Sequence, residues 1–471
     1  MEEAADLFDE VQDQGLTRAV TRDLYVEPPG AQPDPALPPS APERAKITRL
    51  LVRRRKGAEK VFVTGQKGAG KTMTLARIAS DPAITEHFAP VVIHAARHIP
   101  VGAADIRLLL VMLVSQMSQF IVEKKLDQRT EVAGVAIAGV DKTLKDWLGL
   151  YKKPGTPTAP ETFQNPRVEL NAQFLKLSEE ILRDPQRRAQ VLREEHYSVT
   201  ELHRVASALI AFAEHALAVR VDGPQFLLLV IDDLDKYVVP SEVQSIFRDG
   251  MEALRSLPCA AVLTYPYFLN FTESFVQRVE SSAIHNVKVA ERVELPGAVG
   301  PALLPLDRRE LLGPAREFFN GIFDKLAERS LVLDQGVIDR AALLSAGIPR
   351  EFLRLLSAGF ELCIDHQKAR LDLATLEVAR IRLQQTMART ANEPWKQAAL
   401  KLVQSRGTIQ GFSEMLDTVH VVEYVNRAVW YGVHPAMEDL VEGWIRQGPP
   451  TSSSRRGPRP RTSNVNSRNS G

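Results

Sequence analysis

The strongest chemical signal in the sequence is the stretch Gly-Gln-Lys-Gly-Ala-Gly-Lys-Thr, residues 65–72. It fits the spacing G-x-x-x-x-G-K-T of a phosphate-binding loop. Glycines at three positions let the backbone curl so that successive N–H groups point at phosphate oxygens. An apolar strand precedes the loop, and a helix from Met73 to Ala79 follows it and adds its positive N-terminal end. The loop therefore predicts nucleotide binding, and a chance glycine-rich turn is the weaker alternative.

The residues of this loop have separate predicted tasks. Lys71 reaches the β- and γ-phosphates, and the hydroxyl of Thr72 binds Mg²⁺. The backbone around the phosphates is expected to come from the remaining residues: Gly65, Gln66, Lys67, Gly68, Ala69, Gly70 and Met73. The cofactors that follow from these tasks are ATP and Mg²⁺.

A second chemical signal is the run Phe-Leu-Leu-Leu-Val-Ile-Asp-Asp-Leu-Asp, residues 226–235. A continuous apolar run is typical of a parallel strand buried on both faces, and this one ends in acids at the edge where α/β sheets bind ligands. Asp232 is expected to hold Mg²⁺ directly or through water, and Asp233 to orient and polarise the attacking water. Asp235 is either a helix-side cap or an auxiliary acid. An acidic turn after a core strand is the alternative.

Other segments are expected to position the phosphate loop and the acids after the apolar run. Residues 260–264 predict another buried strand, and Thr264 at its end falls where a water-sensing group would sit, although threonine is common in strands. A further strand is expected over residues 284–295. Before the loop, residues 27–42 form a proline-rich connector, and Tyr25 and Val26 could either wrap an adenine or pack on the core.

The C-terminal part of the chain predicts a hairpin. Residues 420–425 and 428–433 are rich in aromatic and β-branched residues and flank the pair Asn426-Arg427. Helices followed by a hairpin indicate a winged-helix-like module. Residues 448–471 contain almost no apolar side chains and are expected to be disordered.

Composition excludes some function classes. The formal charge is +1, so any nucleic-acid contact would need a local patch. The longest apolar run, Leu108–Val114, is too short to span a bilayer, and the acidic N-terminus does not resemble a signal peptide. The two cysteines, Cys259 and Cys363, are expected to be core residues of a cytoplasmic protein.

These motifs together resemble P-loop ATPases of the AAA+/STAND group, above all bacterial STAND-like and KAP-like ATPases and origin-recognition ATPases. The resemblance covers about residues 43–385 and includes residues 65–72, 231–235, Thr264 and 347–350. It implies an α/β fold with a parallel sheet. The domains expected from the resemblance and the chain's composition are an N-terminal segment 1–42, an ATPase core 43–300 with a helical insertion at about 100–220, a helical lid 301–388, a winged-helix-like module 389–447 and a disordered tail 448–471.

The resemblance also implies roles for single residues. Thr264 would be a first sensor, and Arg350 would be a second sensor that touches the γ-phosphate from the lid. Arg278 would reach the γ-phosphate in a neighbouring subunit, with Arg248 and Arg255 as rivals. Most AAA+ enzymes have Glu where this chain has Asp233, so slow hydrolysis is expected.

The main functional hypothesis is an ATP-driven switch that closes its lid and assembles as a homo-oligomer. The STAND group implies a setting in bacterial signalling or antiviral defence, with an effector or sensor protein as a possible partner. The alternatives are a DNA-binding initiator or loader, which the near-neutral charge disfavours, and a scaffold that holds ATP without hydrolysing it. No membrane partner is expected.

Overall fold

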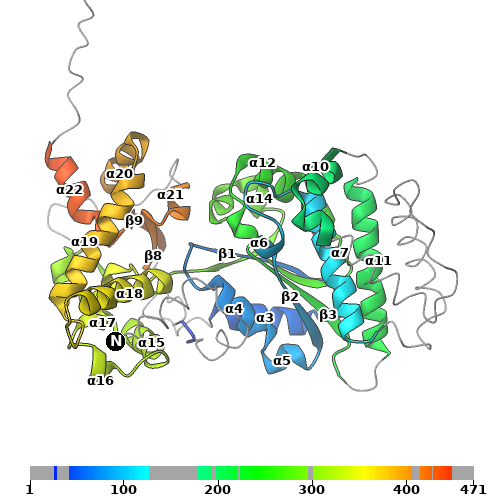
Figure 1. Ribbon diagram of the computed structural model, residues 1–471, viewed down its shortest axis with the longest axis horizontal. Coiled ribbons are helices and arrows are strands. Elements are labelled where there is room, and N and C mark those ends of the chain that lie inside the picture. The colour runs from blue at the N-terminus through cyan, green and yellow to red at the C-terminus, as the bar shows by residue number, and fades with distance from the viewer. Residues whose placement is uncertain are drawn as a thin grey trace, which may run out of the picture.

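The structure is a computed structural model of the 471-residue chain, and it describes residues 26–28, 42–126, 179–193, 198–219, 223–294, 301–405, 414–426 and 428–447. A sheet flanked by helices lies beside a helical part that includes a hairpin (Figure 1). The predictions for Tyr25, for most of the helical insertion and for the tail fall outside the described residues.

Five parallel strands form the central sheet in the spatial order β2-β3-β4-β1-β5. Their bounds are β1 (Lys60–Gly65), β2 (Phe88–His94), β3 (Phe226–Asp232), β4 (Ala260–Thr264) and β5 (Glu280–Ile284). All residues of β1 and β4 are buried, and so are all but the first of β3, because both faces of the sheet are covered. The predicted fold class, an α/β sheet of P-loop NTPase type, is confirmed.

Helices pack on both faces of this sheet. Residues Val61, Val63 and Leu228 share a core with the helices on one face, which are α3 (Glu43–Arg53), α4 (Lys71–Ala79) and α5 (Pro82–Thr85). On the other face, Phe62 and Leu229 share a core with α7 (Ile106–Glu123), α11 (Val199–Ala218) and α13 (Met251–Arg255). The shorter elements of this part are α6 (Ala95–His98), α10 (Pro185–Arg193), η3 (Leu234–Lys236), α12 (Pro240–Val243), the π-helical turn η4 (Gln244–Asp249), η5 (Tyr267–Phe271) and α14 (Glu273–Val276).

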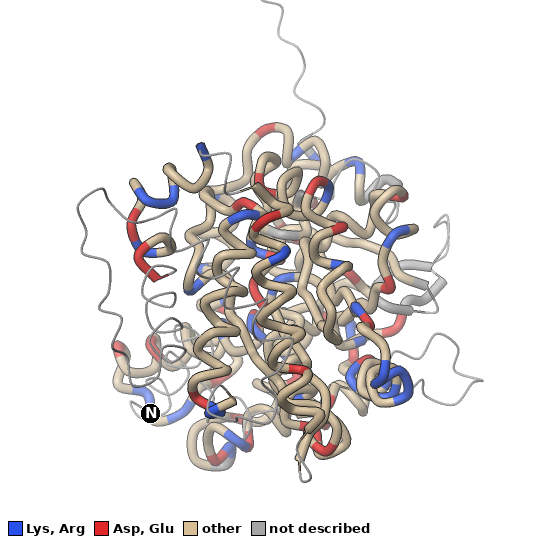
Figure 2. Tube along the Cα trace, turned by 90° about the vertical axis from the view of Figure 1, so that its right-hand side faces the viewer, with Lys and Arg blue, Asp and Glu red and all other residues tan. Residues whose placement is uncertain are grey.

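Helix α7 is long and apolar enough to cross a membrane by length and composition alone, yet 72% of it is buried inside the protein. It packs against α11 and the sheet, so its apolar character is that of a core helix. Both helices lie within the region 100–220 that the sequence predicts as an insertion. Figure 2 shows basic and acidic residues interspersed over most of the face that includes these helices.

The helical part and the hairpin share one hydrophobic core. Phe319, Phe352 and Phe360 belong to the same buried cluster as Val421 and Tyr431 of the hairpin. The helices are α15 (Gly313–Asp324), α16 (Arg329–Val332), α17 (Val337–Leu344), α18 (Pro349–Asp365), α19 (Leu373–Thr390), α20 (Glu393–Ser405), α21 (Glu414–Asp417) and α22 (Glu438–Gln447), with the turns η6 (Leu306–Arg308) and η7 (Pro435–Met437) and the strands β6 (Arg292–Glu294), β7 (Pro301–Leu303), β8 (Val421–Asn426) and β9 (Ala428–Val433).

Two details of the sequence interpretation are corrected. The strand predicted over residues 284–295 is confirmed only at its ends: β5 ends at Ile284, the chain then leaves the central sheet, and β6 (Arg292–Glu294) pairs with β7 in a separate sheet. The amide of Val287 donates to the carbonyl of Gly347 instead of to a neighbouring strand. In the hairpin, Asn426 pairs with Ala428 and therefore belongs to β8, not to a two-residue turn.

Candidate nucleotide site

The phosphate loop connects β1 to α4, as the sequence predicts. Gly65, Gly68 and Gly70 all have positive φ angles, of 152°, 90° and 97°. Gly65 is further constrained because a Cβ there would lie 2.2 Å from the carbonyl oxygen of Ile284 on β5. Helix α4 begins at Lys71, directly after the left-handed Gly70, so its free N–H groups lie at the loop.

The ammonium group of Lys71 is held inside the loop. Its Nζ donates to the carbonyl oxygens of Gly65 at 2.7 Å and Gln66 at 3.1 Å, and it forms an ion pair with Asp235 at 2.9 Å. Asp235, which the sequence leaves open as a cap or an auxiliary acid, is therefore a direct partner of this lysine. A phosphate bound by Lys71 would compete with these oxygens for the same ammonium protons.

Asp232 presents a buried carboxylate oxygen beside Thr72. The residue is 2% exposed, its Oδ1 accepts from the amide of Asp233 at 2.8 Å, and its Oδ2 has no hydrogen-bond partner among the described residues. Burial opposes ionisation, but His94, the Thr72 hydroxyl and the Asp233 amide outweigh it and lower the pKa of Asp232. A buried charged carboxylate beside a hydroxyl is a set of oxygen ligands that suits Mg²⁺.

The pKa of Asp233 is shifted in the opposite direction from that of Asp232. Burial and the neighbouring Asp232 raise the pKa of Asp233, while Lys236 opposes this with an ion pair at 2.8 Å. Its φ of 70° lies in the left-handed region, which costs a non-glycine residue about 1–3 kcal/mol. Two adjacent acids thus differ in pKa, the pattern expected when one carboxylate binds a cation and the other accepts a proton.

His94 is a site residue that the sequence interpretation missed. It ends β2, where the strand register places it beside Asp232. Its Nδ1 lies 3.7 Å from a carboxylate oxygen of Asp232 and 3.9 Å from one of Asp233. The available signal was a polar residue at the end of an apolar strand, but its value depends on β2 being the neighbour of β3, which the sequence does not reveal.

Thr264 lies at the end of β4, between the acids and the loop. It is fully buried, and its Oγ1 accepts a hydrogen bond at 2.9 Å from the amide of Leu234, in the turn that follows the acids. The side chain therefore fixes the turn that carries Asp233. Its role as a first sensor stays a prediction.

Arg350 is brought to the loop by the first turn of α18. Its amide donates to the carbonyl of Gly68 at 3.4 Å, and its Cβ lies 2.8 Å from where a Cβ of Gly68 would stand. The Arg350 side chain is exposed beside the loop. This location is compatible with the second-sensor role, which stays a prediction.

The three candidates for a trans arginine are all exposed. Arg278 precedes β5, whose first residue pairs with Val61, four residues before Gly65 on β1. Glu280 therefore lies at the edge of the sheet opposite the loop, about 13 Å away along the strand, and Arg278 comes two residues before it. No ion pair of its guanidinium is found within the described residues, whereas Arg248 donates to Gln244 and Arg255 pairs with Glu252.

Of the two adenine-wrapping candidates, only Val26 is described, and it is not brought to the loop. Tyr25 is outside the described residues, and Val26 packs against Gly321 of α15. Both cysteines are buried in the core, as predicted.

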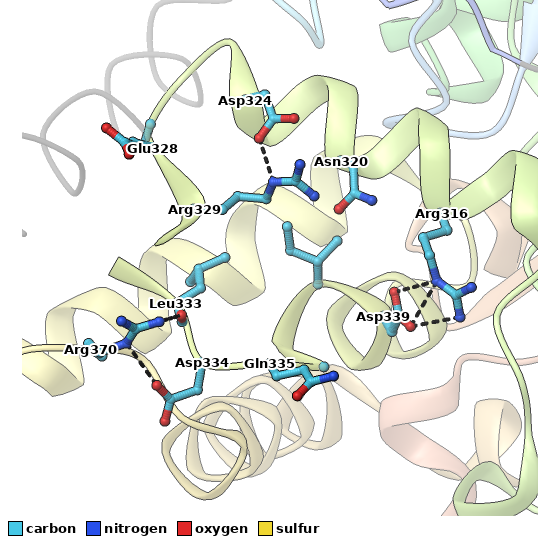
Figure 3. A pocket seen from close by; sticks show the side chains of 13 residues that line it. Arg316, Asn320, Asp324, Glu328, Arg329, Leu333, Asp334, Gln335, Asp339 and Arg370 are labelled. Atoms are coloured by element: carbon cyan, nitrogen blue, oxygen red, sulfur yellow. Dashed lines mark hydrogen bonds and ion pairs between the residues drawn. The ribbon is translucent and has the colours of Figure 1, made fainter. Parts of the chain in front are cut away.

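A separate cavity of about 1060 Å³ lies between α15, α16 and α17 (Figure 3). Ion pairs line it: Arg316 with Asp339, Arg329 with Asp324 and Arg370 with Asp334. None of the predicted site residues that the structure describes contributes to it.

Comparisons with known proteins give remote matches. No family model and no curated protein matches the chain. Among solved structures, the Aeropyrum pernix ORC1 protein in complex with DNA is 14% identical, with a TM-score of 0.35, 86% of this chain covered and 93% of that one. Drosophila ORC bound to DNA is 12% identical (TM-score 0.37; 92% and 93% covered), and Cdc6p from Pyrobaculum aerophilum is 11% identical (TM-score 0.33; 88% and 97% covered).

Proposed function

We propose that the chain is a Mg²⁺-dependent ATPase of AAA+ type that acts as a nucleotide-driven switch. The observation that carries the proposal is the position of the Thr72 hydroxyl, at the start of α4, beside the buried carboxylate of Asp232 at the end of β3. These two groups come from segments 160 residues apart (232 − 72 = 160). A hydroxyl and a buried carboxylate placed beside a phosphate loop are the two protein ligands of Mg²⁺ in P-loop ATPases.

The residues of the site divide the reaction among themselves. The loop amides and Lys71 bind the β- and γ-phosphates, and Lys71 exchanges its contact with Asp235 or a loop carbonyl for a phosphate oxygen. Mg²⁺, held by Thr72 and Asp232, would neutralise charge on the phosphates. Asp233 orients a water for in-line attack and accepts its proton, a task that its raised pKa favours.

A neighbouring protomer is expected to complete the site. Arg278 is exposed at the edge of the sheet opposite its own loop, so it could act only on a nucleotide held by another copy. An arginine supplied in trans stabilises the charge that develops on the transferred phosphoryl group. ATP would then join protomers, and hydrolysis would release them.

The proposal is tested by measuring phosphate release from ATP with and without Mg²⁺. Wild-type protein is expected to release phosphate slowly and only with Mg²⁺, and Asp233→Asn to be at least about 100-fold slower while still binding ATP. Asp249→Asn, an exposed acid outside the site, is the matched control. If wild type and Asp233→Asn both bind ATP and neither releases phosphate, the protein is instead a scaffold that holds ATP.

A second candidate is a DNA-binding initiator or loader. It is supported by the order of modules, in which a lid is followed by α20, the hairpin of β8 and β9, and α22, as in a winged-helix unit. Helix α22 is unfavourable for DNA, because it begins with Glu438 and Asp439. Binding of duplex DNA at low salt that weakens steeply as salt rises would favour this candidate over the switch alone. Absence of binding at low salt, with and without ATP, would exclude it.

A further inference from the structure

The side chain of Gln66, the second residue of the phosphate loop, is directed to the C-terminal part of the chain. Its Nε2 donates to the carbonyl oxygens of Leu416 at 3.2 Å and Val421 at 2.5 Å. Its Oε1 accepts from Nδ2 of Asn286 at 2.7 Å and from the amide of Glu423 at 3.1 Å. A glutamine amide can donate two hydrogen bonds and accept two, so this side chain, which is 1% exposed, uses its full capacity.

Asn286 ties the same cluster together. It lies in the segment between β5 and β6, is 5% exposed, and donates to the carbonyl of Glu423 at 3.0 Å as well as to Gln66. Beside it, Nδ1 of His285 lies 2.7 Å from the buried carboxyl of Glu423. We call the hydrogen-bonded set of Gln66, Asn286, Leu416, Val421 and Glu423 the Gln66 clasp.

The clasp is not the only contact that ties this part of the chain to the loop. The lid also touches it: a Cβ on Gly68 would lie 2.9 Å from Cγ2 of Ile348, and the Gly68 carbonyl accepts from Arg350. The loop is therefore held on one side by hairpin and lid, while Lys71 and the acids lie on the other. Figure 1 shows the hairpin on the side of the helical part that faces the sheet.

We propose that Gln66 and Asn286 are positioning residues through which the C-terminal hairpin holds the phosphate loop in its binding shape. Phosphate binding on the loop and docking of the hairpin then favour one another. The inference rests on the proposed function, since it requires that the loop binds a nucleotide.

The physical reason is preorganisation. A phosphate loop binds through several backbone N–H groups, and their alignment costs conformational entropy when the loop is free to change shape. Four hydrogen bonds at Gln66 remove that freedom before the ligand arrives, so less of the binding free energy is spent on ordering. Coupling between two sites is reciprocal, so a nucleotide must tighten the hairpin by the same factor by which the hairpin tightens the nucleotide.

The test is a double-mutant cycle on the affinity for Mg²⁺–ATP. Gln66→Met keeps the length of the side chain without its hydrogen bonds, and Asn286→Asp keeps the shape without the donor. Each is expected to weaken binding by about fivefold to tenfold. The double variant is expected to lose less than the product of the two, because both residues act through one cluster. Gln277→Met, an exposed glutamine outside the cluster, is the matched control and should bind as wild type does.

The outcomes separate the inference from the proposed function. Wild-type protein that does not bind Mg²⁺–ATP would overturn the function and the inference with it. Wild-type protein that binds Mg²⁺–ATP while both single variants bind equally well would overturn the inference alone. If Gln66→Met fails to fold, as a lost thermal transition would show, Asn286→Asp decides the question, because it removes the two hydrogen bonds that Nδ2 of Asn286 donates and leaves those of Gln66 Nε2 in place.

Discussion

The two sides of the phosphate loop differ in the kind of polar group that they carry. The side of Lys71 is charged: this lysine pairs with Asp235, and the two acids after β3 face His94 and Lys236. The side of Gln66 is held by neutral amides and backbone carbonyls, with Glu423 as its one buried carboxyl among the described clasp residues. Charges suit binding of phosphate and Mg²⁺, whereas saturated neutral hydrogen bonds suit the fixing of a shape.

The greatest loss of activity is expected from a substitution that tests whether a second protomer supplies an arginine to the charged side of the loop. Arg278→Ala should reduce ATP turnover by about 1000-fold, since a trans arginine stabilises the transferred phosphoryl group. Mixing it with Lys71→Ala should restore part of the activity, because one variant supplies the loop and the other the arginine. Arg248→Ala and Arg255→Ala are measured beside it, because these residues are the rival candidates and should keep wild-type turnover if Arg278 is the trans arginine. Lack of recovery in the mixture would argue against a shared site.

Lys71→Ala is expected to weaken Mg²⁺–ATP binding by about 100-fold, because the charge-assisted hydrogen bonds to the phosphates are lost. The affinity can be measured by calorimetric titration. Lys124→Ala removes an exposed lysine after α7 and serves as the control. Nearly equal affinities of Lys71→Ala and wild type for Mg²⁺–ATP would show that Lys71 does not bind the phosphates.

On the neutral side, burial raises the pKa of Glu423 to about 8. This pKa lies above that of a glutamate in the unfolded chain, which is about 4.5. The contribution of protonated Glu423 to the free energy of unfolding is therefore complete below about pH 4.5 and is lost as pH rises through about 8. His285 and Tyr431 face the carboxyl. Burial lowers the pKa of His285 and raises that of Tyr431, so both shifts favour the neutral forms of these side chains.

Glu423→Gln should therefore flatten the decline of the melting temperature between pH 6.5 and 9, and at pH 9 the variant should melt at least about 5 °C higher than wild type. Glu442→Gln, on the exposed face of α22, is the control. Parallel melting curves for wild type and Glu423→Gln across this range would show that the carboxyl does not titrate in the clasp.

The smallest expected effect concerns His94. This residue helps to lower the pKa of Asp232, so His94→Ala should raise that pKa and protonate the carboxylate at a higher pH. Binding of Mg²⁺–ATP by the variant should be about twofold weaker at pH 5.5 and unchanged at pH 8. A loss of equal size at both pH values would instead indicate a direct contact of His94 with the ligand.

The charged side could be predicted from the sequence because its residues belong to local motifs. The glycine spacing indicates the loop, and the apolar run before Asp232 indicates the strand that carries the acids. Strand neighbours are not local, so His94 was missed although the strand that it ends was predicted. Gln66 and Glu423 lie 357 residues apart, and no periodicity connects them. The segment after Ile284 resembles a strand in composition, but its polar groups pair with Glu423 of the hairpin and with Gly347, just before α18.

The coupling between nucleotide binding at the loop and docking of the hairpin is tested most directly by hydrogen exchange. Exchange is followed in the loop segment 60–75 and the hairpin segment 418–433 while Mg²⁺ and a non-hydrolysable ATP analogue are added. We expect both segments to become protected with the same midpoint, and Asn286→Asp to reduce the gain in the hairpin while the loop is still protected at saturation. Protection of the loop with no change in the hairpin would contradict the coupling between the two sides, and no protection of either would contradict nucleotide binding itself.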